Sequence, residues 1–135
     1  MVRYLHGPQT LVRMLVDSST SAISVGDFVV AASAGYVKQA SAGESPVGIA
    51  CEASAVPTAD GDLAIMVDVS RGSVWEYPPD AGTVSQALCN TTMDIGGPAS
   101  INIDASSQDV IIVRAVDLVA NTLHVSLIPT YAGVV

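Results

Sequence analysis

The chain alternates between short apolar runs and clusters of turn residues. Between residues 63 and 69, larger apolar side chains alternate with smaller or polar ones, which is the period of a strand with one buried face. The other runs are too short for ordinary helices and are separated by Gly, Pro, Asp and Asn. We therefore predict strands at 11–16, 28–32, 36–39, 47–53, 63–69, 73–77, 100–103, 110–116 and 123–128.

The remaining segments are interpreted from their local chemistry. Residues 83–90 fit a short helix with Thr83 as N-cap, and 95–98 (IGGP) is typical of a loop. Residues 1–10 contain Gly7-Pro8 and lack periodicity, so they are predicted to form an extended N-terminal arm. The rest, 11–135, is predicted to be one all-β domain, a single antiparallel β-barrel or sandwich.

Charge and composition limit the possible partners. The chain has 13 acidic and 5 basic residues and a net charge of −8, which argues against binding to nucleic acid. Half of its residues are hydrophobic and 4% are aromatic, a composition that favours thin β layers over a deep aromatic-lined pocket. The first 16 residues hold Arg3 and Arg13 but no acid, so this end is locally basic.

Cysteine use and the N-terminal sequence favour a chain made and kept in a reducing cytoplasm. Cys51 and Cys89 each lie in an apolar run, where reduced and buried thiols are expected, although a disulfide between them stays open. Under strand alternation, Cys51 would share a face with Val47 and Ile49. Neither a signal peptide nor a membrane span is expected, because the start has no apolar core and no run approaches about 18 apolar residues.

Catalytic and cofactor motifs are not found. No Gly-x-Ser-x-Gly is present, and His6 and His124 have no partners that the sequence singles out for a triad. The turn at 60–62 (DGD) could offer oxygen ligands to calcium, but Asp-Gly is also common in hairpin turns for backbone reasons. We therefore expect no enzymatic activity and no cofactor, and leave open whether Asp60 and Asp62 bind a cation.

Two segments are candidates for an interaction surface. Trp75 and Tyr77 precede Pro78-Pro79, where a strand must end, and such aromatic residues often anchor interfaces; the alternative is that a ring belongs to the core. The arm could dock on a neighbouring protein, in which case its removal would leave melting of the free protein nearly normal. The alternative is a terminal strand folded onto the chain's own domain. The arm residues proposed for contact are Arg3, Tyr4, Leu5 and His6.

Several of these segments, taken in order, resemble a known family. The run VGDFVV, the turn into GYVKQA and the stretch SPVGIACEAS resemble the N-terminal half of tailed-phage capsid cement, or head decoration, proteins. DLAIMVDVSRGSVWEY is similar to the next strands of that family, and VIIVRAVDLVANTLHVSLIP to its closing hairpin. The resemblance covers about residues 11–129, through turn glycines and apolar runs.

The resemblance implies a non-enzymatic protein of the virion, made in the host cytoplasm. Such a protein binds the outer surface of an icosahedral head and braces neighbouring major capsid protein subunits. It also implies a homo-oligomer, with a trimer as the expected form, and no membrane partner. The alternative function is a carbohydrate-binding or adhesion module on a virion or cell surface, and a small β-barrel enzyme is a third possibility.

Overall fold

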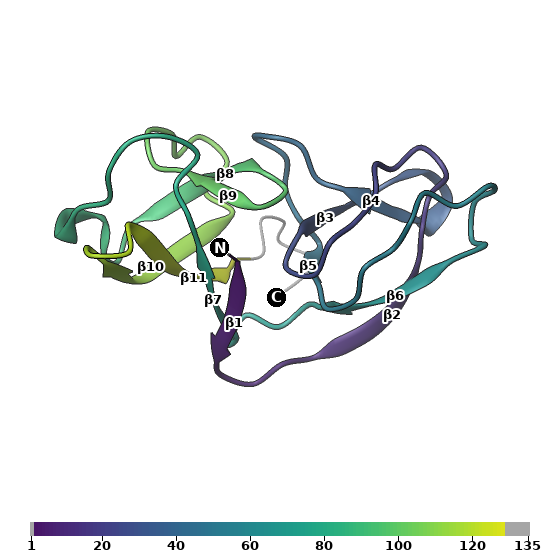
Figure 1. The fold of residues 1–135 in the computed structure, drawn as a ribbon, viewed down its shortest axis with the longest axis horizontal. Helices are drawn as coiled ribbons and strands as arrows, with labels where there is room; N and C mark the ends of the chain where they lie inside the picture. Colours follow the sequence, from purple (N-terminus) through teal and green to yellow (C-terminus); the bar gives the residue numbers. More distant parts are fainter. Residues whose placement is uncertain (1, 129–135) are drawn as a thin grey trace.

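A computed structural model describes residues 2–128 and shows an all-β protein built from two antiparallel sheets (Figure 1). The large sheet has six strands in the order β1-β7-β11-β10-β8-β9. These strands are β1 (Arg3–His6), β7 (Val74–Tyr77), β11 (Thr122–Leu127), β10 (Ile111–Asp117), β8 (Thr92–Gly97) and β9 (Ser100–Asn102).

The small sheet has five strands in the order β2-β6-β5-β3-β4. These are β2 (Leu11–Leu15), β6 (Ala64–Asp68), β5 (Gly48–Ala50), β3 (Phe28–Ala31) and β4 (Val37–Gln39). Neither sheet closes into a barrel, so of the two predicted architectures the structure shows the sandwich-like one.

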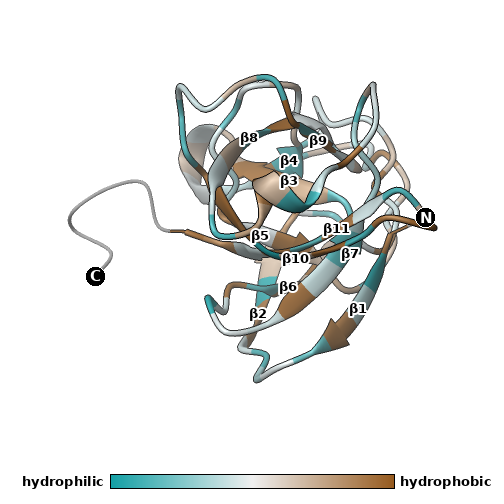
Figure 2. Ribbon diagram, turned by 90° about the vertical axis from the view of Figure 1, so that its left-hand side faces the viewer, coloured by the Kyte–Doolittle hydropathy of each residue, from teal (hydrophilic) through white to brown (hydrophobic). Residues whose placement is uncertain are grey.

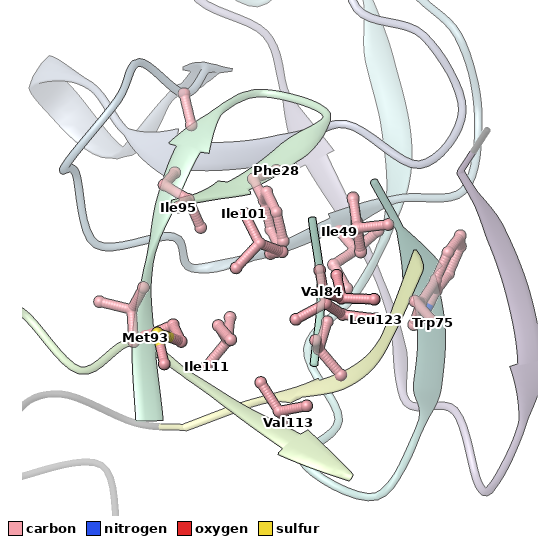
Figure 3. Close-up of a cluster of buried hydrophobic side chains, with 14 of the residues drawn as sticks. Phe28, Ile49, Trp75, Val84, Met93, Ile95, Ile101, Ile111, Val113 and Leu123 are labelled. Atoms are coloured by element: carbon pink, nitrogen blue, oxygen red, sulfur yellow. The ribbon is translucent and has the colours of Figure 1, made fainter. Parts of the chain in front are cut away.

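The main hydrophobic core lies between the two sheets. Phe28 and Ile49 of the small sheet meet Ile101, Leu123 and other side chains of the large sheet there (Figure 3). A second, smaller cluster that includes Val29, Ala50 and Val67 is separate from the main core. Because neighbouring residues of a strand point to opposite faces, β3 supplies both clusters, which explains why its sequence is apolar throughout.

The Gly26-Asp27 pair at the start of β3 forms a structural turn. Gly26 has a φ of +93°, which favours glycine, and an added Cβ would lie 2.5 Å from Cγ1 of Val2. The carboxylate of Asp27 accepts hydrogen bonds from the backbone N–H of Ser24 at 2.9 Å and from the side chain of Gln39 at 2.9 Å. The motif therefore joins the N-terminus, β3 and β4.

The predicted strands are confirmed in kind, and most are shorter by one or more residues at their ends. Three expectations about secondary structure are wrong. Residues 3–6 form β1 rather than part of a free arm, because they pair with β7. Residues 95–97 belong to β8 rather than to a loop, because they pair with β9. The predicted helix at 83–90 is only a short 3₁₀ turn, Gln86–Leu88, and its capping position is Ser85 rather than Thr83.

Candidate interaction surface

Strand β1 places two of the predicted contact residues against β7. The guanidinium of Arg3 donates from Nε to Oε1 of Glu76 at 2.6 Å. The ring of Tyr4 meets Trp75 edge-on, with centroids 5.6 Å apart and planes at 68°. Leu5 is half-buried and His6 is exposed. Residues 3–6 are thus the terminal strand that the sequence left as the alternative.

Glu76 lies at the centre of a polar cluster across β1, β7 and β11. Besides Arg3, it accepts a hydrogen bond from the hydroxyl of Thr122 at 2.6 Å, and Nε2 of His124 lies 3.6 Å from Oε2. The hydrogen bonds from Thr122 and Arg3 hold the pKa of Glu76 below its ordinary value, although burial acts in the opposite direction. Both oxygens of this carboxylate accept hydrogen bonds, and the one from Arg3 links β1 to β7.

The expectation that Trp75 or Tyr77 projects from the surface is wrong for the isolated chain. Trp75 is 2% exposed, and its indole N–H donates to Asp68 at 3.3 Å. Tyr77 is fully buried and stacks on Phe28 with ring centroids 4.4 Å apart. Burial raises the pKa of the Tyr77 phenol well above its ordinary range, and its hydroxyl donates to the carbonyl of Gly26 at 2.5 Å. Both rings therefore serve the core.

The two cysteines are free, but each is half-buried rather than buried. Cys51 follows the end of β5 and Cys89 follows a 3₁₀ turn, so neither occupies a strand centre. Cys51 packs on the main core together with Ile49. Val47 packs on the second cluster instead, so the predicted shared face is confirmed for Ile49 and wrong for Val47, which precedes β5 and does not follow its alternation.

The thiol of Cys51 is expected to react slowly in the native protein. Burial, and next the negative charge of Asp68, raise the pKa of this thiol, so less thiolate is present at a given pH. In a Cys89→Ser variant, alkylation by iodoacetamide at mildly alkaline pH should be several-fold slower in the native state than in urea. The native rate should also go on rising at pH values where the unfolded chain has reached its plateau. Coincident pH profiles for the two states would contradict the prediction.

The other sequence candidates for chemistry have structural partners. Asp60 accepts a hydrogen bond from the N–H of Ser18 at 2.7 Å, and Asp62 one from the N–H of Ala59 at 3.2 Å. Within residues 2–128, no group of three or more His, Cys, Asp or Glu side chains is arranged to hold a metal ion. In the same part of the chain, no helix has the length and hydrophobicity needed to cross a membrane.

Two of the four sheet edges are covered by the chain itself. At β4, the carbonyl of Val37 accepts the N–H of Asp17 at 2.8 Å, and the N–H of Gln39 donates to the hydroxyl of Thr20 at 2.9 Å. At β9, Ile101 exchanges backbone hydrogen bonds with the segment 78–80. Such coverage prevents these edges from pairing with other chains.

The two remaining edges are β1, which has no such cover from the described residues, and β2, which β4 meets only at its end, through the bridge between Val16 and Val37. Residues 3–15 supply both edges, which lie along the lower side of the molecule in the two views (Figures 1 and 2). Leu11, Val12 and Leu15 of β2 are 47%, 41% and 46% exposed. This run, LVRML, was correctly predicted as a strand. It lacks clear alternation, which is also typical of a strand buried on both faces, so the pattern did not reveal that its side chains are exposed to solvent.

The pairing of β2 with β6 determines which backbone groups of β2 point outward. Val69 donates to the carbonyl of Thr10, and Val16 donates to the carbonyl of Leu63, so even-numbered residues face β6. In an antiparallel pair the alternate residues then turn their N–H and C=O groups away. Leu11 and Arg13 therefore present their backbone groups on the open edge, whereas Leu15 lies beside the bridge between Val16 and Val37 of β4.

Comparisons with protein-family models, with curated proteins and with solved structures find no match to this chain. Its function is therefore inferred from its own residues and geometry.

Proposed function

We propose that the protein is a capsid decoration, or cement, protein that binds the outer surface of an icosahedral viral head. Its partner would be the major capsid protein, whose neighbouring subunits it would brace, and it would act as a homo-oligomer, with a trimer as the favoured form. The observation that carries the proposal is the pair of open strand edges, β1 and β2, along one side of an otherwise covered two-sheet fold.

Three features support this proposal over a catalytic role. The order of strand and turn motifs resembles decoration proteins over about residues 11–129. The polar cluster at Glu76 is saturated by contacts within the chain. The open edges expose apolar side chains in a protein with a net charge of −8, a combination that suits binding to another protein's surface.

The alternative of a carbohydrate-binding module receives less support. Sugar sites commonly use exposed aromatic platforms, whereas the closely spaced rings of Trp75 and Tyr77 are buried. A glycan array would test this alternative directly: retention of the wild-type protein on particular glycans would favour it over decoration.

The expected outcome of the central experiment is co-sedimentation with virus particles. In gradients of lysate from the host, the protein should follow intact particles at a constant ratio to the major capsid protein. A Leu11→Glu/Leu15→Glu variant should lose most of this binding, because it places two carboxylates on the open edge.

A matched control is offered by the turn between β10 and β11. Leu118 and Val119 are 56% and 99% exposed there, so Leu118→Glu/Val119→Glu adds the same charge elsewhere and should decorate normally. Wild-type protein that remains at the top of the gradient, in a lysate rich in particles, would overturn the proposed function.

A further inference from the structure

A groove of about 500 Å³ opens in the small sheet where its first and last strands diverge. At the end of β2, a single bridge joins Val16 to Val37 of β4. Before that point β2 pairs with β6 alone, so a gap separates it from the β3–β4 turn. The groove occupies this gap, and its lining includes Met14, Ala31, Tyr36, Val37, Val47 and Val69.

The lining of this groove is mainly apolar and continues the second hydrophobic cluster. Met14, Val47 and Val69 are half-buried and pack on that cluster, while Tyr36 contributes a half-buried ring. Met14 belongs to β2 itself, so the groove adjoins the strand whose outer backbone groups are open. An open edge beside an apolar groove combines the two requirements for strand addition: backbone pairing for affinity and pockets for alternate side chains.

We propose that this edge and groove bind an extended segment of another protein, in which apolar residues alternate with at least one carboxylate. The segment would pair with the outward N–H and C=O groups of Leu11 and Arg13, and its apolar side chains would enter the groove beside Met14. This inference goes beyond the proposed function, because it concerns the recognition of a strand from any source. A failed decoration assay would leave it standing.

The charge of β2 decides which kind of bound segment is favoured. Arg13 is exposed and is the single charged residue of β2, and residues 1–16 contain no acid. A carboxylate on the added strand opposite Arg13 would gain an opposite-charge pair, whereas a basic strand would be repelled.

A second copy of this chain fits the edge less well. Antiparallel self-pairing over the full length of β2 would place Arg13 of one copy opposite Arg13 of the other. Like charges directly opposite each other destabilise a strand pair. The acid-free, basic character of residues 1–16 therefore favours an acidic strand from a different protein.

The test uses the full chain and a display library of random peptides of about seven residues, a little longer than an average strand. Selection on the wild-type protein should enrich apolar peptides that carry Asp or Glu. With the enriched peptides as probes, Arg13→Ala removes the charge and keeps the edge, whereas Arg13→Pro also removes the outward N–H. Arg13→Pro should weaken binding by about tenfold more than Arg13→Ala, the value of one backbone hydrogen bond.

Two further variants keep the test decisive if Arg13→Pro fails to fold. Leu11→Pro, compared with Leu11→Ala, removes another outward N–H, and Ala31→Glu places a carboxylate in the groove at an exposed position. Both Leu11→Pro and Ala31→Glu should weaken binding of the acidic peptides. The proposal is overturned if no acidic apolar peptide is enriched, if the proline variants bind like their alanine controls, or if the wild-type protein self-associates and the proline variants do not.

Discussion

Removal of residues 2–9 is expected to destabilise the isolated protein by at least about 3 kcal/mol. The deletion takes away the side chain of Val2 from the main core and the ring of Tyr4 from Trp75. It also removes Arg3 from the buried carboxylate of Glu76, and this part of the loss is discounted because the Arg3 side chain is 61% exposed. A domain of ordinary stability, about 5–15 kcal/mol, would lose a large part of it.

Urea denaturation monitored by tryptophan fluorescence measures this loss, since Trp75 is the single tryptophan and is covered by Tyr4. The emission of the folded deletion variant should also shift to the red as water reaches the indole. Tyr4→Ala should reproduce the shift with a smaller loss of stability, and Leu118→Ala, in an exposed turn, serves as the control. Near-normal unfolding of the deletion variant would restore the original hypothesis, an arm that serves only to dock on a neighbouring protein.

Tyr77→Ala is expected to cost about 3–5 kcal/mol, the range for truncating a buried aromatic residue. Tyr77 on β7 of the large sheet stacks on Phe28 on β3 of the small sheet, so the pair holds the two sheets together. Its hydroxyl is also the hydrogen-bond donor to the buried carbonyl of Gly26. Truncation would leave a cavity in the main core and an unpaired acceptor.

The two contributions can be separated with a second substitution. Tyr77→Phe keeps the stack and removes only the hydroxyl, and should cost about 1–3 kcal/mol because the Gly26 carbonyl loses its partner. Tyr36→Phe, at a half-buried tyrosine, should change the free energy of unfolding much less. Equal unfolding free energies for Tyr77→Ala and wild type would show that this contact does not hold the sheets together.

The pattern of apolar residues was sufficient to predict the fold class and most of the strands. Alternation along 64–68, and turn residues between the runs, are local properties that depend on backbone geometry alone. The strand at 92–97 was missed because Gly96, Gly97 and the following Pro98 favour a turn, whereas pairing with β9 and β10 makes the segment a strand.

The position of the candidate surface depended on contacts between distant residues, which local patterns do not contain. The sequence marked Arg3, Tyr4 and Trp75, and the structure brings them together because β1 pairs with β7, more than seventy positions away. It also marked Tyr77 as a surface anchor, but stacking on Phe28 places that ring in the core.

The sequence alone therefore determined an acidic, all-β chain with a basic N-terminal segment and showed which residues tend to form strands. Only the tertiary structure decided which strand edges stay open. The edge of β4 is covered because residues 17–20 return to it, and that of β2 is open because the described residues place no segment beside Leu11 and Arg13. Strand formation follows from the repeat of side chains along one segment, whereas edge exposure depends on which other segments reach it in space.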